Sequence, residues 1–144
     1  LDVGSVYLPP PPHPRFMMLI HCRLGDLFSS QYMQEPAIIC YENALKFNAL
    51  GECMPFEKST LLHELGYQYD KLQKYDTALY YYDEALSLMS DTSNISYQNL
   101  LFYIAMLDCT SGEDFDNGIL KAKKLVSQIP EPHRDWRLSV YKTH

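Results

Sequence analysis

The chain has 144 residues, a formal net charge of −6 and a hydrophobic content of 47%. This length and apolar content are enough for one compact domain with a buried core. The acidic balance disfavours a nucleic-acid-binding protein, because phosphate backbones select basic faces. It mildly favours basic or neutral partners.

The cysteines point to a reduced, intracellular protein. Cys22, Cys40, Cys53 and Cys109 form no CxxC pair and no metal-ligand spacing, so we expect neither a bound metal nor a cofactor. The early apolar run at residues 16–20 is followed at once by polar residues, which argues against a signal peptide, a membrane span or a membrane partner. The sequence therefore predicts a cytoplasmic or nuclear location.

The first segment, residues 1–15, is rich in proline and includes Pro9–Pro12. Such a run favours an extended polyproline II conformation, so we interpret it as a linker or tail. The other interpretation is a ligand for an SH3 or WW domain, carried by Pro11 to Arg15. The chain begins with Leu1 rather than Met, which suggests a piece of a longer protein.

A helical pair is predicted near residues 18–51. Small and large residues alternate along both halves at helical spacing: Leu24, Gly25, Phe28, Ala37, Tyr41 and Ala44. Pro36 is expected near the start of the second helix, after a turn at residues 31–35. The extra residues 52–58 are expected to lengthen that second helix until Pro55 ends it.

The clearest pattern lies near residues 59–92. Its first half carries Leu62, Leu65, Gly66 and Tyr69, and its second half carries Ala78, Tyr82 and Ala85. This spacing suits two antiparallel helices in which the small residues let the backbones approach closely.

A third, weaker copy is predicted near residues 99–132. Its pattern residues are Phe102, Ala105, Met106, Cys109, Gly118, Ala122, Leu125 and Pro130. Residues 132–144 would then form one more helix that carries Trp136. This helix either caps the end of the array or begins a partial repeat.

The series of a large residue, Leu, Gly, Tyr, Ala, an aromatic residue and Ala in residues 59–92 resembles the tetratricopeptide repeat (TPR). The copies recur after 41 and 40 residues, as in a long-period variant of the repeat. The resemblance implies an all-α fold over residues 16–144, a right-handed superhelix of antiparallel helix pairs. It also implies a protein–protein interaction module.

The resemblance further implies a concave groove lined by the first helix of each pair. The residues expected to line it are Leu19, Cys22, Asp26, Ser29, Thr60, His63, Tyr67, Asp70, Leu100, Tyr103, Leu107 and Thr110. Tyr67 and Tyr103 would supply contact area, while Asp26 and Asp70 would select a basic or amide-rich ligand. The groove lacks the Lys, Asn and Arg clamp of TPR domains that hold acidic EEVD-type tails.

The sequence contains no recognised catalytic motif, and His63 is interpreted as a groove or surface residue rather than a general base. We therefore expect an adaptor or scaffold that captures a peptide or helix segment, not an enzyme. The alternative is a structural or self-associating module. It would pack through the ends of the array or through a convex face that carries Tyr80 and Tyr81.

Overall fold

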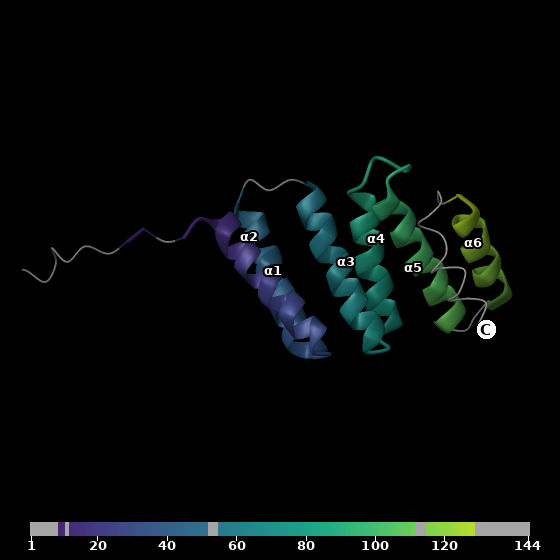
Figure 1. The fold of residues 1–144 in the computed structure, drawn as a ribbon, viewed down its shortest axis with the longest axis horizontal. Coiled ribbons are helices and arrows are strands. Elements are labelled where there is room, and N and C mark those ends of the chain that lie inside the picture. Colours follow the sequence, from purple (N-terminus) through teal and green to yellow (C-terminus); the bar gives the residue numbers. More distant parts are fainter. Residues whose placement is uncertain (1–8, 11, 52–54, 112–114, 129–144) are drawn as a thin grey trace, which may run out of the picture.

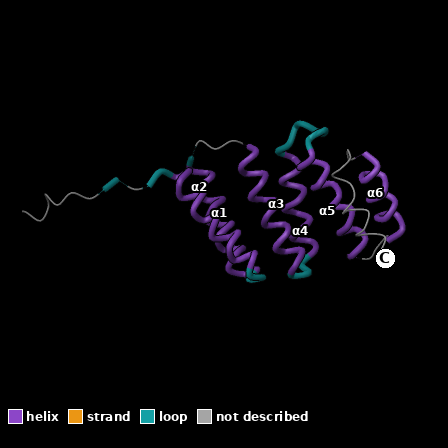
Figure 2. Tube along the Cα trace, viewed as in Figure 1, coloured by secondary structure: helices purple, strands orange, loops and turns teal. Residues whose placement is uncertain are grey.

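The computed structural model describes residues 9–10, 12–51, 55–111 and 115–128 (Figure 1). Over these residues it contains six helices and no strand, so the predicted all-α class is confirmed (Figure 2). The helices are α1 (Pro14–Ser30), α2 (Gln34–Leu50), α3 (Pro55–Lys71), α4 (Tyr75–Ser87), α5 (Ile95–Ser111) and α6 (Phe115–Gln128). The predicted helix at residues 132–144 lies outside the described residues.

The six helices pack as three consecutive pairs. Within the pairs, α1 packs on α2, α3 on α4 and α5 on α6; between the pairs, α2 packs on α3 and α4 on α5. Figure 1 shows the three pairs following one another along the long axis of the molecule. Short turns join the two helices of the first two pairs and make them antiparallel. None of the described helices combines the length and apolar character needed to cross a membrane.

Two helix boundaries differ from the predictions. Helix α1 begins at Pro14, inside the segment predicted as a linker, because Pro is well suited to a first helical position and the His13 side chain caps the helix. The His13 Nδ1 atom accepts a hydrogen bond from the Arg15 backbone N–H at 3.1 Å. Helix α2 ends at Leu50, so the prediction that it continues to Pro55 was wrong: Pro55 starts α3 instead.

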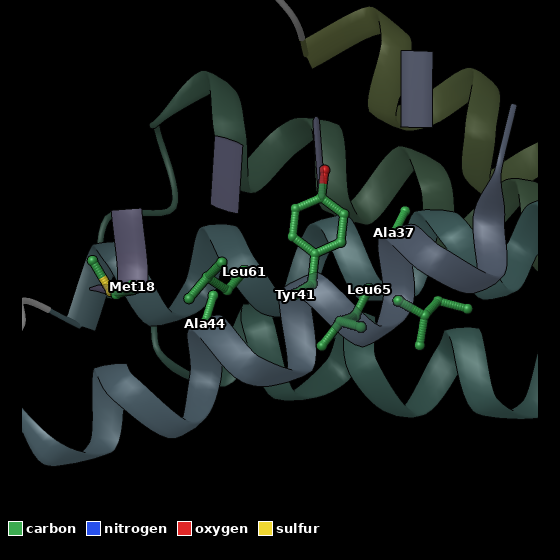
Figure 3. Packing of buried hydrophobic residues seen from close by; sticks show 7 residues of the cluster. Met18, Ala37, Tyr41, Ala44, Leu61 and Leu65 are labelled. Carbon is green, nitrogen blue, oxygen red and sulfur yellow. The ribbon is translucent and has the colours of Figure 1, made fainter. Parts of the chain in front are cut away.

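A close contact between glycine and tyrosine sets the spacing within the first two pairs. A Cβ atom added to Gly25 would lie 2.7 Å from the Tyr41 ring, and one added to Gly66 would lie 2.6 Å from the Tyr82 ring. Both tyrosines are completely buried. Figure 3 shows Tyr41 within the first core cluster, which also contains Leu61 from the next pair. The tyrosine ring therefore occupies the space that the glycine leaves open.

The third pair reverses the sizes at this contact. Forty residues after Gly66 and Tyr82 stand Met106 and Ala122, and these two pack in one cluster. Nearby, a Cβ atom on Gly118 would lie 2.7 Å from the Cys109 sulfur. In the third pair the large residue therefore stands on the first helix and the small one on the second. The side chains still fill the contact, although the Gly and Tyr of the sequence pattern are absent.

The turns inside the first two pairs share one strained geometry. Tyr32 and Gln73 have φ angles of 58° and 61°, in the left-handed region. At Gln73 the backbone N–H donates to the Asp70 carbonyl, and the next N–H donates to the Tyr69 carbonyl, each at 2.9 Å. This arrangement closes a helix end in the way that usually employs glycine.

The first prediction concerns the seam between α3 and α4. Gly66→Ala should lower the free energy of unfolding by about 1 to 2 kcal/mol, because overpacking against Tyr82 outweighs the better helix propensity of alanine. Chemical denaturation monitored by circular dichroism measures the change. In a Tyr82→Leu background the same substitution should cost much less. An equal cost in both backgrounds would contradict the steric explanation.

The second prediction concerns the turn between α3 and α4. Gln73→Gly should stabilise the fold by about 0.5 to 1 kcal/mol, since glycine relieves the left-handed strain and loses only part of that gain to chain entropy. Lys74→Gly is the matched control, because Lys74 has a φ of −92° and should lose stability on substitution. Equal effects of the two variants in thermal unfolding would argue against strain at Gln73.

Candidate functional site

A cavity of about 390 Å³ lies between the first helices of the first two pairs, and we call it the α1–α3 cavity. Its lining residues are Met18, Leu19, Cys22, Arg23, Asp26, Glu57, Thr60 and Leu61. The two buried lining residues, Met18 and Leu61, are apolar, and the exposed ones are charged or polar apart from Leu19. Four residues predicted to line the groove are among them: Leu19, Cys22, Asp26 and Thr60.

Two cross-links hold α1 and α3 on either side of this cavity. Toward the helix N-termini, the Arg15 guanidinium pairs with the Glu57 carboxylate. Toward the C-termini, the Gln68 side-chain amide donates a hydrogen bond to the Ser29 hydroxyl at 2.8 Å. Ser29, another predicted groove residue, therefore fastens the two helices together. The cavity is a preformed gap between fixed walls.

Carboxylates dominate the electrostatics of the cavity. The Tyr41 hydroxyl donates to Asp26 Oδ1 at 2.6 Å, and Arg23 lies 4.0 Å from Asp26 Oδ2. Burial, with a smaller contribution from Asp26, raises the pKa of Glu64. Burial also raises the pKa of the Cys22 thiol, assisted by Asp26 and Glu64, so that thiol stays protonated. Together these groups favour a ligand that brings positive charge or hydrogen-bond donors.

One carboxylate oxygen of Glu57 accepts no hydrogen bond from the described residues. Its Oε2 atom is buried and has no hydrogen-bond partner among the described residues, although its other oxygen faces Arg15. A buried acceptor left in this state costs free energy that a ligand N–H could recover. The orphaned oxygen therefore makes the cavity wall receptive to a donor.

An aromatic cluster fills the space between the second and third pairs. It consists of His63, Tyr67, Tyr82 and Tyr103. Tyr103 is the central ring: its centroid lies 5.4 Å from that of His63, 6.2 Å from that of Tyr67 and 5.9 Å from that of Tyr82. Burial lowers the pKa of His63. Three predicted groove residues, His63, Tyr67 and Tyr103, are thus brought together, and they pack mainly on one another.

The end of α3 places a cation beside this cluster. Lys71 Nζ lies 4.9 Å from the Tyr67 ring centroid and 5.9 Å from that of Tyr32. Asp70, predicted to select basic ligands, is half-buried, and its burial raises the pKa of the carboxyl group. A ligand near Asp70 would therefore also meet the ammonium group of Lys71.

Two predicted groove residues belong to the core instead. Leu100 and Leu107 are 1% and 3% exposed and pack in one cluster with Tyr82 and Ala85, so the prediction that they face a ligand was wrong. The two leucines are seven residues apart with Tyr103 between them, and this stripe is the face of α5 that meets the preceding pair. The Thr110 side chain lies outside the described residues.

Sequence reasoning missed Glu57 and Glu64. Glu57 reaches the cavity only because α3 starts at Pro55, one turn earlier than the repeat pattern indicates. A Pro followed by an acidic residue in the first turn is a recognisable signal for a helix start, and it could have located Glu57. No comparable signal marks Glu64.

Comparison with known proteins gives one family. A comparison with curated proteins found no match. Residues 59–92, which hold α3 from Ser59 onward and all of α4, match the family model of the tetratricopeptide repeat. Residues 59–92 are therefore a tetratricopeptide repeat.

Proposed function

We propose that this chain is an adaptor or scaffold module that binds a peptide or helix segment of a protein partner in its concave groove. The observation that carries the proposal is the α1–α3 cavity, a preformed gap lined by buried apolar residues, by the exposed Asp26 and by Glu57 with its buried, orphaned oxygen. Repeats of this family are protein-interaction units, which supports the general assignment.

The ligand is a segment rich in basic or amide side chains. Asp26, Glu57 and Glu64 together place three carboxylates on the two helices that form the cavity. Arg15 is already paired with Glu57, which reduces its use as an anion receptor. An acidic EEVD-type tail would meet like charges here, so it does not fit the proposal.

The aromatic cluster would provide the second contact. Tyr67 and Tyr103 are half-buried and edge-on to each other, which gives a rigid surface that loses little side-chain entropy on binding. Lys71 above Tyr67 would favour a polar or acidic residue at that end of the ligand. The ligand would thus be basic near α1 and tolerate an acidic group near α5.

The wider proposal follows the sequence predictions. It comprises a TPR domain over residues 16–144 with a right-handed superhelical sense, no catalytic role and no nucleic-acid partner. A cytoplasmic location is supported by the free thiols of Cys22, Cys40 and Cys109. The alternative is a structural or self-associating module that packs through its convex face or its ends. Tyr80, predicted to lie on the convex face, is exposed and packs edge-on against Tyr81, which is compatible with this alternative.

The third prediction tests the charge preference of the groove. Peptides that carry Lys and Gln should bind the full chain more tightly than matched peptides with Glu at the same positions. This binding should weaken as the salt concentration increases. Asp26→Asn should weaken binding about threefold to tenfold, because it removes the charge but keeps an acceptor for Tyr41.

Asp76→Asn is the matched control, since Asp76 is an exposed carboxylate on α4. Leu19→Arg should abolish binding by placing a cation at the cavity rim. Fluorescence anisotropy measures all of these affinities. Tighter binding of the Glu-containing peptides would refute the proposed chemistry. So would a loss of affinity in the Asp76→Asn control equal to that in Asp26→Asn.

The fourth prediction concerns Glu64. Its pKa in the folded chain lies above the ordinary value of 4.5, mainly because of burial. A raised pKa means that the folded chain favours the protonated carboxyl group. The stability that this group contributes is therefore fully present below pH 4.5, and it is lost as the pH rises through the pKa of Glu64 in the folded chain. Glu64→Gln should raise the melting temperature at pH 7, and the gain should disappear below about pH 4.5. Glu84→Gln at an exposed position of α4 is the control, and a pH-independent gain would contradict the electrostatic cause.

A further inference from the structure

Helix α1 presents an apolar face that no other described helix covers. The face consists of Phe16, Ile20, Leu24 and Leu27, which are between 36% and 63% exposed. Their spacing places all four side chains along one side of the helix. We call this surface the α1 face.

The second repeat shows what covers the equivalent surface. Aligning Gly25 with Gly66 places Ile20, Leu24 and Leu27 on Leu61, Leu65 and Gln68. These three residues of α3 are at most 3% exposed. The two leucines form one core cluster with Ile38, Tyr41 and Ala44 of α2, the second helix of the preceding pair.

The same relation recurs one pair further along. Helix α5 buries Leu100 and Leu107 against Tyr82 and Ala85 of α4. Each first helix that follows another pair is therefore covered by a second helix. The α1 face has the same apolar character and lacks this covering helix among the described residues.

We propose that the α1 face binds an acidic amphipathic α-helix of another protein, which packs on it as α2 packs on α3. The interaction would extend the stack of helix pairs at α1. The four apolar residues of the α1 face lie outside the lining of the α1–α3 cavity.

Charge argues for an acidic helix and against a second copy of this chain. Arg23 lies on the same side of α1 as Ile20 and Leu27, at the border with the α1–α3 cavity. Its side chain is 84% exposed and lies 4.0 Å from Asp26, so its guanidinium can still face a carboxylate of a bound helix. The described part of α6 carries Lys121, Lys123 and Lys124, which would repel Arg23 in a head-to-tail contact. Two α1 faces in an antiparallel pair would bring their Arg23 side chains together. Helix α4, in contrast, carries Asp76, Asp83 and Glu84 and no basic residue.

The test uses the full chain and two helical probes. One peptide carries the sequence of residues 75–89, which includes α4, and the other carries the sequence of α6. A side-chain lactam on the polar face locks each peptide as a helix, and a fluorophore reports binding by anisotropy. The acidic α4-type peptide should bind about tenfold more tightly than the lysine-rich α6-type peptide.

Matched surface variants locate the binding site. Ile20→Ser with Leu27→Ser should weaken binding of the α4-type peptide at least about tenfold, while Ile39→Ser with Leu50→Ser on the exposed side of α2 should not. All four side chains are solvent-exposed, so folding should survive and circular dichroism verifies it.

Two results would overturn the proposal. One is equal binding of the α4-type peptide by the Ile20 and Leu27 double variant and the parent chain. The other is a dimer in sedimentation experiments that the same double variant converts to a monomer, because the occupant would then be a second copy of this chain.

Discussion

The close approach of the two helices in a pair is the constraint on which the rest of the structure depends. Gly66 leaves room for the buried Tyr82 ring, and Gly25 does the same for Tyr41. The same rings then contribute to the clusters that join one pair to the next. One contact thus sets the crossing within a pair and part of the surface that stacks on the following pair. In keeping with this dual role, both partners of the contact differ together in the third pair, where Met106 and Ala122 stand.

The contact between Gly25 and Tyr41 also influences the chemistry of the α1–α3 cavity. Tyr41 is buried by its packing against Gly25, yet its hydroxyl reaches Asp26 on the α1 side of the cavity. This hydrogen bond holds one oxygen of the Asp26 carboxylate, and the other oxygen lies toward Arg23. A residue that lines the cavity is therefore oriented by a core residue, which is how a rigid first helix can present charge without a flexible loop.

The sequence predicted the helices better than the groove. Gly66, Ala78 and Tyr82 carry a spacing that only paired helices satisfy, so the pattern identified the fold. It could not predict the rotation of α5, because that helix is apolar on most sides. Periodicity alone does not distinguish a half-buried residue of the aromatic cluster such as Tyr103 from a core residue such as Leu107. The sequence did not predict Glu57 as a cavity residue for a different reason. The repeat pattern indicates the middle of α3 but not the residue at which the helix begins.

The acidic character of the cavity is not a requirement of stacking. Forty residues after Glu64, in the third helix pair, stands Ile104, which packs in an apolar cluster against the second pair. An aliphatic residue therefore suits the surface between pairs, whereas the carboxylate of Glu64 has its pKa raised by burial and by Asp26. Burying a carboxylate beside another opposes folding, and Glu57 adds an acceptor without a donor. Glu57 lines the α1–α3 cavity, and Glu64 lies on the same helix. A ligand whose donors compensate for these two groups would offset their cost, which agrees with the proposal of a basic or amide-rich segment between α1 and α3.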